Sequence, residues 1–180
     1  MRRASPADAS AIARVYVRTW RAAYRGHLPG TLLRNLSEIR ETLQWWTSLC
    51  TAGADSATYV AVDRAQGIVG FGAGGRERKG KTRRRAEVYT LYVLPAHQRK
   101  GVGRRLLAAA TQHLGDRGFE SLIVWVLASN PARAFYESLS GRPAGARTIR
   151  LGGRHLQEIS YVWESLDGIV VAATGSASQR

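Results

Sequence analysis

A short run of glycines and basic residues has the composition of an anion-binding site. It reads Gln98-Arg99-Lys100-Gly101-Val102-Gly103 and lies between an apolar run and an amphipathic stretch. Glycine lets a ligand approach the backbone closely, and the first N–H groups of a helix have no partner within the helix. The helix dipole and the neighbouring basic side chains add positive charge. The run therefore predicts a pyrophosphate site, although a tight strand-to-helix turn would also need glycine.

The elements expected around this run are a strand before it and a helix after it. Residues 87–94 are rich in Val, Tyr and Leu, and Pro95 ends the strand that they predict. Residues 103–114 carry a helical apolar stripe, and residues 121–127 form a nearly continuous apolar run that is typical of a buried strand. Strand, helix and strand in this order predict a parallel crossover connection.

The remaining elements complete one domain. A helix is expected from Asp8, and another from Ser37 with Ile39, Leu43, Trp46 and Cys50 as its apolar stripe, which would place Cys50 in the core. Strands are expected at 58–63, 68–75, 146–151 and 156–163, and a short helix from Pro131 to Leu139. The predicted fold class is α/β (α+β), with a mixed central sheet of about six to seven strands flanked by helices. The domain is expected to span 1–167 and a flexible tail 168–180.

The charge balance is strongly basic. The chain has 27 Lys plus Arg against 13 Asp plus Glu, a formal net charge of +14. Such a surface attracts anionic ligands, and an Arg-rich, Ala-rich and Gly-rich composition also follows from a GC-rich genome. The basic loop 76–85 is expected to be a solvated hairpin tip, with contact to an acidic partner as the alternative.

Other features limit the location and the chemistry of the protein. The lone cysteine excludes an internal disulfide, and no apolar run is long enough for a signal peptide or a membrane span, so a cytoplasmic location without membrane contact is expected. The four histidines show no metal-site spacing, so no metal is expected. The glycines of Gly70–Gly75 match a dinucleotide fingerprint, but a basic loop rather than a helix follows them.

Two segments together resemble the GNAT superfamily of acetyltransferases. The first is Leu91–Pro95 followed by Gln98–Arg105, which contains the Q/R-x-x-G-x-G/A signature. The second is Ala128-Ser129-Asn130 followed by Ala134–Leu139. The resemblance extends over roughly residues 5–165 and implies the GNAT fold with acetyl-CoA as cosubstrate. One departure is Leu139-Ser140-Gly141, where the family usually has Leu-Gly-Phe, and it bears on the packing of the next strand.

The resemblance also implies the contacts to the cosubstrate. Backbone groups of Leu91, Tyr92 and Val93 would pair with the pantetheine arm as an added strand does, and an N–H group near Val93 would stabilise the oxyanion. Backbone N–H groups from Arg99 to Arg104 would hold the pyrophosphate. The full set of implied cosubstrate-binding residues is Leu91, Tyr92, Val93, Gln98, Arg99, Lys100, Gly101, Val102, Gly103, Arg104, Asn130 and Arg133.

Two residues are candidates for acid–base catalysis. Glu87, in the strand before the glycine-rich run, is a candidate base, because a carboxylate in an apolar sheet needs a partner or a task. Strand alternation would give it the same side-chain direction as Leu91 and Val93, and the alternative is an ion pair with Arg83–Arg85. Tyr136 is a candidate acid for the leaving thiolate, with aromatic packing as the alternative.

The predicted function is transfer of an acetyl group from acetyl-CoA to a primary amine by direct attack in a ternary complex. The acceptor, a small amine or an amine of a peptide or protein, stays open. A non-catalytic acyl-CoA-binding regulatory protein and an RNA- or ribosome-associated modifier are the alternatives. Nucleic-acid binding is not favoured, and a homodimer stays open.

Overall fold

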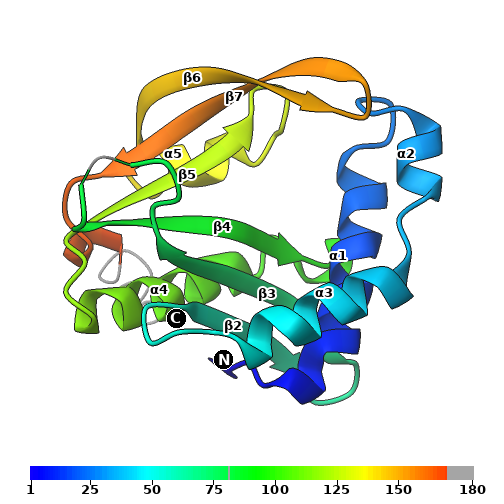
Figure 1. The fold of residues 1–180 in the computed structure, drawn as a ribbon, viewed down its shortest axis with the longest axis horizontal. Coiled ribbons are helices and arrows are strands. Elements are labelled where there is room, and N and C mark those ends of the chain that lie inside the picture. The colour runs from blue at the N-terminus through cyan, green and yellow to red at the C-terminus, as the bar shows by residue number, and fades with distance from the viewer. Residues whose placement is uncertain (81, 170–180) are drawn as a thin grey trace.

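The computed structural model describes residues 1–80 and 82–169, and its central feature is a twisted mixed sheet (Figure 1). The sheet has seven strands in the order β1-β2-β3-β4-β5-β7-β6, which confirms the predicted fold class. Its strands are β1 (Arg2–Arg3), β2 (Ala57–Asp63), β3 (Gly67–Arg76), β4 (Arg85–Val93), β5 (Ser121–Leu127), β6 (Arg142–Leu151) and β7 (Arg154–Trp163). The strand β1 was not predicted, and residues 170–180 of the predicted tail 168–180 lie outside the described residues.

The connection between β4 and β5 is the predicted parallel crossover. After β4 the chain makes the short helix η2 (Pro95–His97), enters α4 (Val102–Asp116) and returns as β5, which pairs in parallel with β4. The other neighbouring strands in the sheet pair antiparallel. The last two strands form a hairpin whose outer member, β6, is an edge of the sheet and carries a register shift between Pro143 and Gly145.

The strands β4 and β5 separate towards their carboxyl ends. Their register runs only from Arg85 paired with Ser121 to Val88 paired with Val124, and beyond this point the two ribbons diverge (Figure 1). Beyond Val88 the β5 side of β4 has no paired strand among the described residues. We call this gap the β4–β5 opening.

A bulge in β4 changes which side chains share a face. The register with β3 passes from Gly74–Val88 to Ala73–Thr90, so Tyr89 is an extra residue. As a result Val88, Leu91 and Val93 pack on the α4 side, whereas Tyr92 packs against α1. The prediction that Glu87 shares its direction with Leu91 and Val93 is therefore wrong, because the extra residue reverses the alternation.

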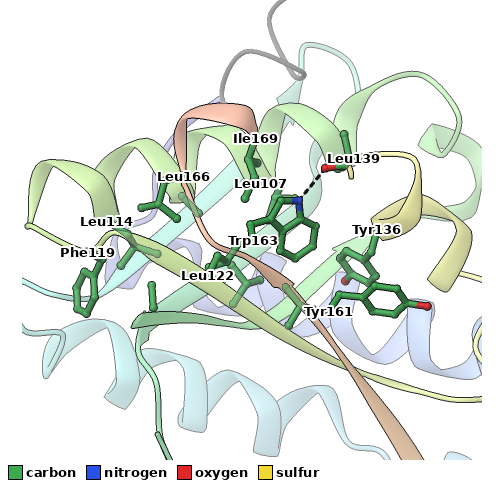
Figure 2. Packing of buried hydrophobic residues seen from close by; sticks show 14 of the residues in the cluster. Leu107, Leu114, Phe119, Leu122, Tyr136, Leu139, Tyr161, Trp163, Leu166 and Ile169 are labelled. Atoms are coloured by element: carbon green, nitrogen blue, oxygen red, sulfur yellow. Dashed lines mark hydrogen bonds between the residues drawn. The ribbon is translucent and has the colours of Figure 1, made fainter. Parts of the chain in front are cut away.

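The larger core lies on the α4 side of the sheet (Figure 2). Leu107 and Leu114 of α4 pack with Leu122 of β5 and Trp163 of β7, and the Trp163 indole donates a hydrogen bond of 2.7 Å to the Leu139 carbonyl. This side also holds the short helix α5 (Arg133–Glu137). Ile169 is fully buried in the same cluster, so the packed region reaches two residues past the predicted boundary at 167.

Three helices come before β2: α1 (Ala9–Ala23), α2 (Gly30–Arg34) and α3 (Glu38–Cys50). The short helix η1 (Pro6–Asp8) leads into α1. The helix α2 begins directly after its N-cap, Pro29. It lies beside the turn of the β6–β7 hairpin, and a Cβ added at Gly152 in that turn would come within 2.9 Å of Leu32 (Figure 1).

The apolar stripe predicted for α3 faces solvent. Ile39 is 78% exposed, and Leu43, Trp46 and Cys50 are also exposed. The inward side chains are instead Trp45 and Leu49, and the Trp45 ring stands 4.9 Å from the Phe71 ring. The prediction of a buried Cys50 is therefore wrong, because α3 carries two apolar stripes and only one of them packs on the sheet.

The segment Leu139-Ser140-Gly141, which departs from the GNAT pattern, packs closely against Trp163. A Cβ added at Gly141 would lie 2.5 Å from the Trp163 ring, so this position accepts only glycine. The preceding Ser140 takes the left-handed conformation at φ +61° and completes the turn out of α5. The strand β6 forms directly after it.

No helix in the described part of the chain is long and apolar enough to cross a membrane.

Candidate active site

The glycine-rich run forms a turn that leads directly into α4. Gly101 is the N-cap of the helix with φ +73°, and Arg99 also has a positive φ of +60°. The Gln98 side chain donates a hydrogen bond of 2.8 Å to the Val93 carbonyl, which anchors the turn to the end of β4. The first turn of α4 closes with the hydrogen bond from the Arg105 N–H to the Gly101 carbonyl at 3.1 Å. The helix itself therefore does not use the N–H groups of Val102 and Gly103, the arrangement that suits an anion.

Gly103 keeps the space above this helix end open. A Cβ added there would lie 3.7 Å from the Phe135 ring and 3.9 Å from Val93. Any larger side chain would press on Phe135 or occupy the space in front of the N–H groups. Because Gly103 has no side chain, none stands between a ligand and the backbone N–H groups at this position.

The predicted contact residues from β4 and α5 border this opening. The Tyr92 hydroxyl accepts a hydrogen bond of 2.9 Å from the Trp20 indole. Tyr136 is buried, with its ring 5.8 Å from Tyr161 and 6.3 Å from Trp163 (Figure 2). Burial raises the pKa of the Tyr136 phenol well above its usual range. Within the described residues no hydrogen-bond partner is found for its hydroxyl.

The side chains of Asn130 and Arg133 are already engaged within the fold. Asn130 Nδ2 donates to the Tyr24 hydroxyl at 3.2 Å, and its Oδ1 accepts from the Ala132 N–H at 2.9 Å. Arg133 donates to the Tyr161 hydroxyl at 3.0 Å and to the Ala128 carbonyl at 3.3 Å. Both residues line a surface pocket of about 410 Å³. Their direct contact with a cosubstrate stays a prediction.

Glu87 is buried at the start of β4 and is held by one arginine. Its Oε2 accepts the Arg78 backbone N–H at 3.0 Å, and its Oε1 accepts the Arg78 guanidinium through Nε at 3.1 Å and through Nη2. The predicted alternative was an ion pair with Arg83–Arg85, and the observed partner is Arg78 of the same basic loop. These hydrogen bonds raise the pKa of Arg78, and the charge of Glu158 adds to the effect.

A second, partly buried carboxylate is paired in a similar way on β7 and β6. Glu158 of β7 accepts Nε and Nη2 of Arg147 on β6, each at 2.7 Å, and the Arg147 guanidinium lies 4.0 Å over the Trp125 ring. Sequence reasoning missed Arg147 and could not place Glu158. The sequence did contain a signal for Arg147. In a strand its side chain points the same way as those of Ile149 and Leu151, which are both apolar, so a charged residue stands on an otherwise apolar face.

Tyr24 links α1 to the opening. It is buried, its hydroxyl receives the Asn130 amide, and its pKa is raised mainly by burial and further by the charge of Glu158. Its contact with Asn130 joins residues that are 106 positions apart.

Two further predictions concern features outside this site. The Gly70–Gly75 segment is an internal part of β3, where a Cβ at Gly74 would lie 2.7 Å from the Glu87 carbonyl. These glycines therefore serve close strand packing and do not open a helix. Among residues 1–80 and 82–169, no group of three or more His, Cys, Asp or Glu could hold a metal ion.

Comparison with known proteins identifies relatives over nearly the whole chain. The model of the acetyltransferase (GNAT) family matches residues 13–141. The chain is 31% identical over 169 residues to the uncharacterized N-acetyltransferase YuaI of Bacillus subtilis (strain 168), which covers 94% of this chain and 95% of that protein.

Solved structures share the fold at lower identity. The ribosomal-protein-alanine N-acetyltransferase from Brucella melitensis superposes with a TM-score of 0.69 at 24% identity, over 91% of this chain and 98% of that one. The acetyltransferase yncA from Salmonella typhimurium, solved with its cofactor acetyl-CoA, gives 0.66 at 21% identity over 91% of both chains. The extent of the family match and the identity to a curated N-acetyltransferase show that this protein belongs to the GNAT family of N-acetyltransferases.

Proposed function

We propose that the protein moves the acetyl group of acetyl-CoA directly to a primary amine while both substrates are bound. The observation that carries this proposal is the β4–β5 opening, which has the α4 helix end at its mouth and buried titratable groups on either face. Because β4 and β5 are not paired with each other beyond Val88 and Val124, two substrates are proposed to meet there from opposite faces of the sheet. This geometry favours direct attack, because a buried carboxylate, Glu87, lies just before the opening on β4 and a buried phenol, Tyr136, lies on the α4 side of the sheet.

Acetyl-CoA is proposed to bind between the end of β4 and the turn that leads into α4. Among the described strands, none pairs with Leu91, Tyr92 and Val93 on the β5 side, so this backbone can pair with an extended ligand as an added strand does. The turn from Arg99 to Arg104 lies at the end of that strand and presents the positive end of a helix to a pyrophosphate. A solved relative, yncA, was obtained with acetyl-CoA.

Glu87 is the proposed base. An amine must lose a proton before or during attack on the thioester carbonyl. Within the described part of the chain, Oε1 of Glu87 accepts two hydrogen bonds from the Arg78 side chain, whereas Oε2 accepts one, from the Arg78 backbone N–H. A carboxylate oxygen can accept two, so Oε2 retains capacity for the amine or for a water that relays its proton.

Tyr136 is the proposed acid. Its raised pKa keeps the phenol neutral at physiological pH, and a neutral phenol can donate the proton that the departing thiolate needs. The amine nitrogen forms a bond to the acetyl carbon, the carbon–sulfur bond breaks, and the Tyr136 proton goes to sulfur. A backbone N–H near Val93 stabilises the oxyanion in between.

Two linked experiments test the proposal. Acetyl-CoA binding is measured by titration calorimetry, and release of the free thiol is then followed with a panel of amines. Saturable binding with amine-dependent thiol release supports the proposal. Binding without release under any amine would favour a non-catalytic acyl-CoA sensor, and absence of binding would reject the proposed cosubstrate site.

A further inference from the structure

Two arginine–glutamate pairs stack on aromatic rings on one face of the sheet, and both lie on the α1 side. Arg78 pairs with Glu87 and lies 4.6 Å over the Tyr89 ring, and Arg147 pairs with Glu158 and lies 4.0 Å over the Trp125 ring.

Strand register places the second pair on this face. Leu127 is paired with Glu158, and Glu158 is paired with Arg147, so the three side chains point the same way. Leu127 packs with Tyr24 of α1, and Ile149, which shares the parity of Arg147, belongs to the same cluster. The charge of Glu158 acts on both Arg78 and Tyr24, which ties the second pair to the first and to the opening. We call the region between the two arginines the acceptor face.

A ligand that enters this face meets guanidinium groups before carboxylates. The side chains of Arg78 and Arg147 are 56% and 30% exposed, whereas those of Glu87 and Glu158 are 3% and 15% exposed. The negative charges therefore lie beneath the positive ones. A second ammonium group on the acceptor would be repelled here, and an anionic group would be attracted.

Each guanidinium also keeps donors for a further partner. Arg147 uses Nε and Nη2 towards Glu158, and Arg78 uses the same two atoms towards Glu87. The end of each guanidinium, formed by Nη1 and the second proton of Nη2, can still donate two parallel hydrogen bonds to an acid group. The aromatic ring and the carboxylate hold both groups in place before the ligand arrives, which lowers the entropy cost of binding.

The far end of the acceptor face is closed. The turn of the β6–β7 hairpin packs on α2, where a Cβ at Gly152 would come within 2.9 Å of Leu32 and 3.4 Å of Pro29. Leu32, Leu151 and Leu156 belong to one cluster at this end. An extended peptide could not pass through such a packed end, so the face suits a small acceptor.

We propose that the acceptor is a small amine that also carries an acid group, either a carboxylate or a phosphonate or phosphate, and that Arg147 and Arg78 bind this group. This inference rests on the proposed acetyl transfer. The acid group anchors the acceptor on the arginines and leaves its amine to point towards Glu87 and the β4–β5 opening.

The test uses acceptors in matched pairs with the wild-type protein. One arm compares the common L-amino acids with their uncharged amides, and a second compares aminoalkylphosphonates and O-phosphoserine with the corresponding alcohols. Spermidine represents amines without an acid group. We expect kcat/KM for at least one acid to exceed that of its neutral partner by about 10- to 100-fold, because the neutral analogue leaves the guanidinium donors unpaired. The two arms distinguish a carboxylate from a phosphorus acid.

Variants of Arg147 connect the preference to the site. Arg147→Lys keeps the charge but loses the planar fork, and the double variant Arg147→Gln with Glu158→Gln removes both charges without leaving a buried carboxylate unpaired. Both should raise KM for the acid acceptor and reduce the acid-to-amide ratio towards about one, with acetyl-CoA affinity unchanged. Arg150→Lys is the matched control for Arg147→Lys, because Arg150 is exposed on the opposite face of the same strand and this change also keeps the net charge.

The outcomes separate this inference from the proposed function. Amine-dependent thiol release with amides or spermidine preferred over every acid would overturn the inference and leave acetyl transfer intact. A panel in which no acid binds the CoA complex by calorimetry more tightly than its neutral partner would also overturn it. Loss of acetyl-CoA binding itself would instead reject the proposed function.

Discussion

The groups expected to hold the cosubstrate belong mainly to one continuous stretch, Leu91–Arg104, whereas the groups on the acceptor face come from distant parts of the chain. The first set consists mostly of backbone N–H and C=O groups, shaped by Gly101 and Gly103. The second consists of side chains such as Tyr24, Arg78 and Glu158, which only the folded sheet brings together. A backbone site depends on glycine and on a helix end, so it is preserved when surface side chains change. A side-chain site can acquire a new acceptor through single substitutions.

The largest expected effect tests the backbone site. Gly103→Trp should weaken acetyl-CoA binding by about 100-fold or more, because the indole would separate the ligand from N–H donors whose charge-assisted hydrogen bonds are each worth about 1.5–3 kcal/mol. Calorimetry measures the change. Gly53→Trp is the control, since no atom lies within 4 Å of a Cβ there. Equal affinity in both variants would place the cosubstrate elsewhere.

Glu87→Gln tests the acceptor side. It should lower kcat by about 100-fold and leave acetyl-CoA affinity unchanged. The loss of kcat relative to the wild type should be greatest at low pH and should become smaller as the pH, and with it the fraction of neutral amine, rises. Glu120→Gln serves as the control, because Glu120 pairs with Arg84 at the surface. A rate–pH profile parallel to that of the wild type would exclude Glu87 as the base.

Tyr136→Phe tests the proposed acid, which is buried in the core on the α4 side of the sheet. The variant should lower kcat by about 10- to 100-fold with little change in acetyl-CoA affinity, because only the proton donor is lost. Thiol release in single turnover measures the effect. Tyr59→Phe, at the rim of the same core, should have no effect. Full activity of the Tyr136 variant would leave Tyr136 with a packing role alone.

The anchoring of α1, which carries Tyr24, has a predictable pH dependence. Two hydrogen bonds of 2.7 Å from Arg2, with others from Ser5, lower the pKa of Asp8 from 3.8 to about 2. The interactions of the ionised Asp8 carboxylate therefore stabilise the fold fully above about pH 4. This contribution is lost as the pH falls through about 2 and the carboxylate is protonated. Asp8→Asn should therefore lower the free energy of unfolding by about 1 kcal/mol at pH 7 and by almost nothing near pH 2. The value at pH 7 is modest because Arg2 is half exposed to solvent. Urea unfolding at the two pH values measures it, and an equal cost at both would contradict the assignment.

The smallest effect concerns the turn after α5, which belongs to neither site. Ser140→Gly should raise the free energy of unfolding by about 0.5 kcal/mol, because glycine adopts φ +61° without steric cost and offsets part of this gain by its greater unfolded-state entropy. Ser138→Gly, at φ −65°, should lower it instead. Thermal unfolding compares the two variants, and activity should not change in either. Destabilisation by Ser140→Gly would contradict the strain argument.

The sequence predicted the part of the molecule that depends on local patterns. Strand, Pro95, glycine-rich turn and amphipathic helix appear in order along the chain, so the crossover and the turn followed from neighbouring residues. The stretch Gly30–Arg34 contains glycine after Pro29, and its short helix could not be distinguished from a turn. In α3 two apolar stripes overlap, and only the position of Phe71 decides that Trp45 packs inward.

The acceptor face could not be predicted because its geometry depends on tertiary contacts. One extra residue, Tyr89, reverses the side-chain alternation of β4, and nothing in the letters around it indicates a bulge. The pairing of Glu87 with Arg78 needs the basic loop to fold back over β4. Arg147 and Glu158 meet only because the hairpin register places them opposite each other.

The edge position of β6 bears on how the protein behaves at high concentration. An edge strand is paired on one side only, so it offers the free N–H and C=O groups of its other side to other chains and can nucleate aggregation. Here that strand carries Arg142 and Arg150 on its exposed surface, and Pro143 beside a register shift interrupts its hydrogen-bonding row. Like-charged side chains and an irregular edge oppose strand addition. Replacing these residues with neutral β-formers would therefore be expected to reduce the solubility of the protein before it changes its fold.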